Sequence, residues 1–174
     1  MGGEVDGIDL EEGAVRLRSA REDDLDPLVE MWSQPEVSRW WPDQTRDSIR
    51  TTIMGDPDIT PLVIEVDGNG AGFLQIWEET DPEYRHAGID LALHPRFQGR
   101  GLGPDAIRMA CRWLFAHGHH RITIDPAANN GRARRAYAKV GFREVGRLRR
   151  YQWDPATGDW TDGVLYDLLE EDLT

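Results

Sequence analysis

Apolar residues recur along this chain with two periods, which divide it into expected strands and helices. Alternation of apolar and polar residues, or a short apolar run between turn residues, is typical of strands and is found at residues 14–18, 61–66, 71–77, 88–94, 121–125, 142–153 and 164–169. Apolar residues three and four positions apart are typical of helices and occur after Ser19, from Asp47 to Met54, after Gly103 and after Asn130. Asp67-Gly68 predicts a hairpin. This order predicts an α+β fold, with one mixed β-sheet flanked by helices.

Length and composition indicate a single globular domain. The chain has 174 residues, of which 39% are hydrophobic and 30% charged, and this is enough to bury a core. Residues 1–13 are acidic and contain glycine, so we expect a flexible arm before a domain that spans residues 14–174. No apolar run approaches the roughly 20 residues of a membrane span, and no basic-then-apolar leader begins the chain, so we expect a cytoplasmic protein with no membrane partner.

The charge of the chain is large and unevenly divided. The net charge of −12 argues against nucleic acid as a partner, because binding to phosphates relies on basic groups. Residues 1–90 hold 22 acidic residues against 7 arginines, whereas residues 91–174 hold 10 against 13 Lys and Arg. This division suits a cationic ligand on the first half and an anionic one on the second, or acidic solubilising surface with local arginine clusters. The five histidines have no spacing with carboxylates that suits a metal, so we expect no metal site.

A glycine-rich turn at residues 98–103, Gln-Gly-Arg-Gly-Leu-Gly, joins an expected strand to an expected helix. Glycine lets a backbone turn tightly and approach a ligand closely. A helix that begins at such a turn directs free N–H groups and the positive end of its dipole at an anion. The turn therefore indicates a pyrophosphate site, although a short glycine cluster alone is a weak signal.

Two motifs together resemble the GNAT superfamily of acetyl-CoA-dependent N-acetyltransferases. The pyrophosphate motif of that family is matched by Gln98, Gly101 and Gly103, and its later signature by Asn130, Ala133, Tyr137, Gly141 and Phe142. Within the superfamily the chain is most similar to the aminoglycoside 6'-N-acetyltransferases. The features that favour this branch are Trp40-Trp41, Gly88-Ile89-Asp90 and Asp125-Pro126.

The resemblance implies a GNAT fold, acetyl-CoA as cofactor and a set of residues that bind it. That set is Leu91, Leu93, Gln98, Gly99, Arg100, Gly101, Leu102, Gly103, Asn130, Arg134 and Tyr137. One position departs from the family, because Pro104 stands where a small or hydroxyl residue is usual. Proline suits the first turn of a helix but removes one N–H that could face the pyrophosphate. Arg134 has an alternative role as part of a solvated face.

Two aspartates lie in expected strands where aspartate is disfavoured, Asp90 in 88–94 and Asp125 in 121–125. We expect both to bind ammonium groups of the substrate, and Asp90 to accept a proton from the attacking amine, directly or through water. An Asp with a pKa near 3.9 is a weak base at neutral pH, so either burial or relay of the proton through water must help it. The alternatives are an ion pair for Asp90 and a strand-end turn for Asp125.

Tyr137 lies on the apolar face of its expected helix, and spacing alone would make it a core aromatic. The resemblance implies instead that its hydroxyl meets the coenzyme sulfur and acts as general acid. Trp40 and Trp41 are candidates for stacking on a sugar ring and for cation–π contact, with at least one of them in the core. Glu79 and Asp81, in the acidic stretch 78–83, are the remaining candidates for binding a cationic substrate.

We therefore expect an acetyl-CoA-dependent enzyme that acetylates a primary amine of an aminoglycoside, at the 6' position, by direct attack in a ternary complex. One alternative keeps the donor and changes the acceptor to a siderophore lysine, a polyamine or a protein N-terminus. Another is a module that binds CoA without turnover. The expected partner is a small cationic amine, and the expected state is a monomer or a homodimer.

Overall fold

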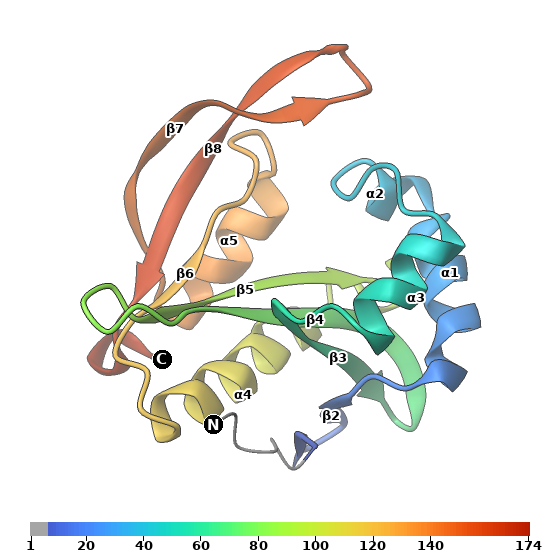
Figure 1. Cartoon of the computed structure of the whole chain (residues 1–174), viewed down its shortest axis with the longest axis horizontal. Coiled ribbons are helices and arrows are strands. Elements are labelled where there is room, and N and C mark those ends of the chain that lie inside the picture. The colour runs from blue at the N-terminus through green and yellow to red at the C-terminus, as the bar shows by residue number, and fades with distance from the viewer. Residues whose placement is uncertain (1–6) are drawn as a thin grey trace.

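The computed structural model describes residues 7–174, and these residues form a β-sheet with helices on both faces (Figure 1). Its strands are β1 (Asp9–Glu12), β2 (Val15–Ser19), β3 (Ile59–Val66), β4 (Asn69–Glu79), β5 (His86–Leu93), β6 (Ile122–Ile124), β7 (Arg143–Asp154) and β8 (Asp159–Leu168). Its α-helices are α1 (Leu25–Trp32), α2 (Pro35–Ser38), α3 (Arg46–Met54), α4 (Leu102–Ala116) and α5 (Gly131–Val140). The α+β fold with one mixed sheet is as the sequence predicts.

The strands form one sheet in the order β1-β2-β3-β4-β5-β6-β8-β7. Neighbouring strands are antiparallel except β5 and β6, which are joined by the crossover helix α4 and run parallel. The ladder between β5 and β6 is short, because it pairs only Ala87 with Ile122 and Gly88 with Thr123. Beyond Gly88 the two strands diverge, and the sheet opens between them.

Two apolar clusters, one on each face, explain why β3 and β4 are nearly continuous apolar runs. Leu62 and Ile64 of β3 belong to the cluster that also contains the apolar stripe of α4. Val63 points the other way, into the cluster formed with α1 and α3. Successive residues of a strand face opposite sides, so a strand covered on both faces has no polar side to show. The described residues include no helix that is long and apolar enough to cross a membrane.

The N-terminal segment differs from the flexible arm predicted for residues 1–13. Residues 9–12 form the edge strand β1, which pairs with β2 in the register Asp9↔Arg18 and Glu11↔Arg16. Both side-chain oxygens of Asp9 accept hydrogen bonds from Arg16, each at 2.7 Å. Acidic residues of β1 are therefore held by opposite charges across the ladder, while Leu10 between them packs against the core. The prediction also covers residues 1–6, which lie outside the described part of the chain.

The helix predicted after Ser19 does not begin directly at that residue. The chain first makes a 3-10 turn at Glu22–Asp24, and α1 follows. The Asp24 carboxylate accepts the Arg21 backbone N–H at 2.7 Å and pairs with Arg18. Asp24 therefore closes the turn, because its carboxylate satisfies an N–H that precedes the helix and neutralises a nearly buried arginine.

Candidate active site

A cavity of about 750 Å³ lies where β5 and β6 diverge, and its walls come from parts of the chain far apart in sequence. The loop after α2 and the β7–β8 hairpin stand on opposite sides of it (Figure 1). Ten residues predicted for the site line it: Trp40, Trp41, Asp90, Leu91, Leu93, Gln98, Gly103, Asp125, Asn130 and Tyr137. The fold therefore brings the acidic, aromatic and glycine-turn candidates into one space.

The glycine turn ends at this cavity, where Gln98 and Gly103 form part of the wall. Gly99 and Gly101 have φ angles of +74° and +80°, a region that side chains disfavour. Helix α4 begins at Leu102, and the Asp105 N–H bonds the Gly101 carbonyl at 3.2 Å. Pro104 is the third residue of the helix and has no N–H group. The first turn of the helix therefore offers the N–H groups of Leu102 and Gly103 to an anion, but none from residue 104.

The divergence of β5 from β6 leaves one edge of β5 open to the cavity. The Ala87 N–H bonds the Arg121 carbonyl at 3.1 Å, whereas the His94 N–H bonds Ala71 on the other side at 2.9 Å. Backbone groups alternate along a strand, so the amides of Leu91 and Leu93 face the side of Ala87, where β6 has moved away. Gln98 donates to the Leu93 carbonyl at 2.8 Å. This edge can hold an extended ligand that carries amide groups.

Asp90 lies in β5 among apolar neighbours and lines the cavity. The Gln75 amide donates to its carboxylate at 3.1 Å from the neighbouring strand β4. Burial raises the pKa of Asp90 to about 6, the negative charge of Asp125 adds to the rise, and the Gln75 hydrogen bond opposes it. This carboxyl is therefore half-titrated close to neutral pH, as a proton acceptor in this range should be.

Asp125 follows β6 directly and accepts a hydrogen bond from the Tyr151 hydroxyl of β7. Burial raises the pKa of Asp125, and the Tyr151 hydrogen bond opposes that rise. Tyr137 of α5 is buried at the wall, and its pKa is raised by burial and by the charges of Asp90 and Asp125. The phenol of Tyr137 is thus protonated at neutral pH and available as a donor.

The two tryptophans have different surroundings. Trp41 packs against Trp32 and Phe73, with ring centroids 5.7 and 6.2 Å apart, so it belongs to the core as well as to the cavity wall. The Arg39 guanidinium lies 4.7 Å from the ring centroid of Trp40. Arginine already stacks on this ring, which shows that a cation can sit there.

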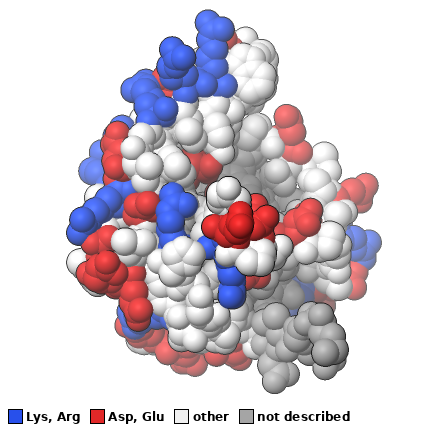
Figure 2. Space-filling view, turned by 60° about the vertical axis from the view of Figure 1, so that its left-hand side comes forward, with Lys and Arg blue, Asp and Glu red and all other residues white. Residues whose placement is uncertain are grey.

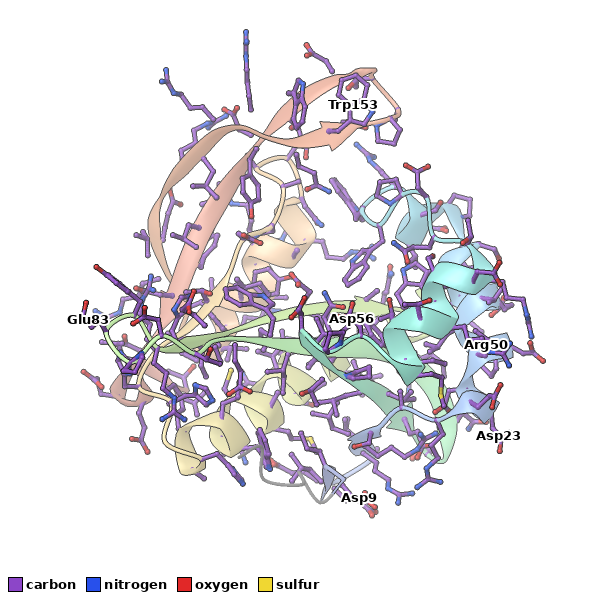
Figure 3. The ribbon with its side chains drawn as sticks, in the orientation of Figure 1. Asp9, Asp23, Arg50, Asp56, Glu83 and Trp153 are labelled. Carbon is purple, nitrogen blue, oxygen red and sulfur yellow. The ribbon has the colours of Figure 1, made fainter. Side chains whose placement is uncertain are left out.

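Three of the predicted residues lie away from the cavity. Glu79 accepts the Asp81 N–H at 2.9 Å, and Asp81 accepts the Glu83 N–H at the same distance, so these carboxylates close the β4–β5 turn. Figure 3 shows Glu83 at the far end of that turn, pointing outward. Arg134 donates to the Tyr166 hydroxyl at 2.8 Å and the Ala128 carbonyl at 3.1 Å, and it does not line the cavity.

The rest of the glycine turn lies beside the wall but does not line it, and consists of Gly99, Arg100, Gly101 and Leu102. The Arg100 guanidinium lies 5.8 Å from the ring centroid of Phe97. Asn130 lines the wall, but its side chain also accepts the Ala133 N–H at 3.2 Å and so caps α5. Its position therefore has a structural role in addition to any contact with a ligand.

Sequence reasoning missed several residues of the wall, among them Gln75, Arg132 and Tyr151. Gln75 pairs with Asp90 in the β4–β5 register, which alternation alone leaves open. Arg132 donates to Gln98 and so links α5 to the glycine turn. The sequence signal that could have identified Arg132 is its position two residues after the capping Asn130, at the start of a helix.

Comparison with known proteins decides the family. The acetyltransferase (GNAT) domain model matches residues 14–143, which is most of the chain. The chain belongs to the GNAT acetyltransferase family. Aminoglycoside N(6')-acetyltransferase type 1 of Klebsiella pneumoniae is 29% identical over 156 residues, covering 78% of this chain and 77% of that protein. A Bacillus subtilis protein assigned provisionally as a [ribosomal protein bS18]-alanine N-acetyltransferase is 28% identical, covering 79% and 87%.

The solved structures agree with this family. The crystal structure of the aminoglycoside acetyltransferase AAC(6')-Ib in complex with coenzyme A and kanamycin has a TM-score of 0.75 and 26% identity, covering 91% of this chain and 96% of that one. As a GNAT acetyltransferase, the chain is an N-acetyltransferase with acetyl-CoA as its donor. Two features of the cavity fit that group: N–H donors at the glycine turn for the pyrophosphate, and the open edge of β5 for the amide-bearing pantetheine arm. Among residues 7–174, no three His, Cys, Asp or Glu side chains gather as a metal site.

Proposed function

We propose that this enzyme acetylates a primary amine of a polycationic small molecule, and that the 6' amine of an aminoglycoside is the first candidate. The observation that carries the proposal is the pair Asp90 and Asp125, which line one cavity from two diverging strands. Two carboxylates facing one space favour a ligand with more than one ammonium group. The similarity to aminoglycoside acetyltransferases supports the same choice.

Each carboxylate has a separate role in this proposal. Asp125, held by Tyr151, binds an ammonium group that does not react. Asp90, whose pKa burial raises to about 6, takes a proton from the reacting amine, directly or through water. An amine attacks only when its lone pair is free, so a base near the reacting nitrogen speeds the step. Trp40 adds an aromatic face on which a ring of the acceptor can stack.

The donor side uses the glycine turn, the β5 edge and Tyr137. Acetyl-CoA supplies an acyl group activated as a thioester. Leu102 and Gly103 offer N–H groups at the start of α4, and Arg132 offers a positive charge close to Gln98. Tyr137 is protonated at neutral pH, as a phenol with an ordinary pKa of 10 or above is, and in this proposal it gives its proton to the leaving sulfur.

The net charge of the chain supports an acceptor that is cationic. Figure 2 shows Lys and Arg gathered at the upper end of the molecule, where the β7–β8 hairpin lies, while Asp and Glu spread over much of the rest of this face. With a net charge of −12, the chain attracts polycations at low salt. We therefore expect acceptor binding that weakens as salt is added.

A protein N-terminus is the second candidate acceptor, and the similarity to the Bacillus subtilis protein favours it. A siderophore lysine or a simple polyamine would use the same donor site. These acceptors differ in charge, because an alanine N-terminus brings one ammonium group whereas an aminoglycoside or a polyamine brings several. Asp125 is therefore the residue that separates the candidates.

An amine panel tests this proposal. Purified enzyme with acetyl-CoA is offered kanamycin, spermidine, a siderophore amine and a peptide that begins with alanine, and free thiol release is followed. We expect kanamycin to have the highest kcat/KM and Asp125→Asn to raise the KM of kanamycin about tenfold or more. Asp23→Asn, at an exposed site in the turn before α1, is the matched control and should leave kinetics unchanged. Preference for the alanine peptide, with no effect of Asp125→Asn, would contradict the proposal.

A further inference from the structure

Tyr151 reaches Asp125 because β7 is irregular at this point. Leu148 pairs with Gly163 and Gln152 with Thr161, so residues 149–151 lie opposite Asp162 alone. Arg150 adopts a φ of +50° within this bulge, which is unusual for a residue with a side chain. Bulges bend a strand and redirect its side chains, and they recur next to active sites. Here the bulge turns Tyr151 onto the carboxylate of the neighbouring loop.

Asp162 of β8 holds the bulge in place. One carboxylate oxygen accepts the Arg150 backbone N–H at 2.8 Å, and the other accepts the Arg147 side chain at 2.6 Å. Hydrogen bonds to an ionised acceptor are short and strong. The strained backbone at Arg150 is therefore stabilised by a residue on the opposite strand.

Gly163 provides the space in which Tyr151 lies. A Cβ atom at this position would come within 2.7 Å of Tyr151 Cδ1 and 3.2 Å of Tyr151 Cγ. These distances are shorter than ordinary contacts between carbon atoms. The tyrosine ring can rest on the backbone of β8 only because residue 163 has no side chain.

The same segment of β8 also holds the loop that carries Asp125. The Ala128 N–H bonds the Asp162 carbonyl at 2.7 Å, and the Val164 N–H bonds the Pro126 carbonyl at 2.9 Å. Asp162 and Gly163 thus contact the bulge on one side and the loop after β6 on the other, although neither lines the cavity. Their position fixes Tyr151 and Asp125 relative to each other.

We propose that Asp162 and Gly163 are positioning residues for the acceptor, which hold Tyr151 against Asp125 and thereby fix the carboxylate that binds an ammonium group. This rests on the proposed function in one respect, namely that Asp125 contacts the acceptor. Loss of the arrangement leaves the glycine turn, the β5 edge and Tyr137 unchanged. Acceptor affinity should therefore fall while donor affinity is kept.

The kinetic test compares Gly163→Ala with Gly146→Ala. Gly146 also lies in β7, but a Cβ there meets no atom within 4 Å, so this variant controls for the loss of glycine. With the best acceptor of the amine panel, we expect Gly163→Ala to raise the acceptor KM about tenfold, with kcat and the acetyl-CoA KM within about twofold of wild type. Gly146→Ala should leave all three unchanged. In a Tyr151→Phe background, Gly163→Ala should have no additional effect.

The proposal would be overturned if the acceptor KM of the Gly163→Ala/Tyr151→Phe double variant rose by the product of the two single effects. It would also be overturned if Gly163→Ala weakened acetyl-CoA and acceptor binding equally. A second measurement needs no acceptor: the carboxyl titration of Asp125, followed by carbon-13 NMR. The Tyr151 hydrogen bond opposes the rise in the pKa of Asp125, so both substitutions should raise that pKa, and by similar amounts. An unchanged titration in both variants refutes the arrangement. Absence of turnover with every amine counts against the proposed function alone.

Discussion

If Asp90 is a base made effective by burial, its charge should destabilise the folded enzyme at neutral pH. Burial raises the pKa of this carboxyl from its ordinary value of 3.8 to about 6. The native state therefore holds the proton over a range of pH in which the unfolded chain has lost it. A group of this kind contributes full stability below pH 4, and that stability is lost as the pH rises through about 6.

The magnitude follows from the two pKa values. A rise of about two pKa units corresponds to about 3 kcal/mol of unfolding free energy at pH 8. Asparagine has nearly the same shape and carries no charge, and its carbonyl can accept the Gln75 hydrogen bond. We expect Asp90→Asn to gain stability over wild type by about 2 kcal/mol between pH 4.5 and pH 8, because about 1 kcal/mol of the total is already lost at pH 4.5, above the ordinary pKa of 3.8.

Urea unfolding at pH 4.5, 6 and 8 measures this difference in free energy. Asp24→Asn is the control, because the pKa of Asp24 is shifted in the opposite direction. Burial would raise the pKa of Asp24, but the Arg18 and Arg21 hydrogen bonds outweigh it and leave that pKa lowered. Asp24 therefore titrates below the measured range in both the native and the unfolded state, so the difference in stability between Asp24→Asn and wild type should stay nearly constant from pH 4.5 to 8. An Asp90→Asn difference that stays constant from pH 4.5 to 8 would refute the reasoning.

Three further outcomes test the donor side. Tyr137→Phe should lower kcat about a hundredfold and leave CoA affinity by calorimetry unchanged, and a normal kcat would remove its role as acid. Gly101→Ala, at a φ of +80°, should cost about 1–2 kcal/mol in urea unfolding and raise the acetyl-CoA KM; an unaltered KM would exclude the turn from binding. Arg132→Ala should raise the acetyl-CoA KM severalfold, whereas Arg134→Ala, which loses its bonds to Tyr166, should lower Tm only. The reverse pattern would mean that the two arginines have been assigned to the wrong roles.

Local patterns in the sequence were enough to predict the fold and the two aspartates. Asp90 and Asp125 stand out because a polar residue in a buried strand needs a reason, and that signal depends on immediate neighbours only. The same holds for the glycine turn, whose spacing is a property of one segment, whereas the role of Tyr137 was inferred from the family resemblance, because spacing alone would make it a core aromatic. The extent of the sheet was underestimated at its edge, because β1 is stabilised by charges across the ladder that its own composition does not reveal.

Contacts between segments that are distant in the sequence could not be predicted from these local patterns. Tyr151 enters the site through a bulge whose position depends on the register of β7 with β8. Glu79 pairs with His86, four residues before Asp90, and a strand rises about 3.3 Å per residue, so this carboxylate lies roughly 13 Å along the strand from the site. Arg132 and Arg134 point to opposite sides of α5, since each helical residue turns by about 100°. Sequence spacing cannot say which of those sides meets the glycine turn.

The pH dependence of kcat/KM for the best acceptor tests the central claim most directly, because it reports the base of the free enzyme. For wild type, we predict a rise with an apparent pKa near 6, the value to which burial raises that of Asp90. For Asp90→Asn, we predict a value at least about a hundredfold lower at pH 7.5, with this rise absent and any rise from the amine itself kept. An Asp90→Asn enzyme with the wild-type kcat/KM and the same rise near pH 6 would contradict the account.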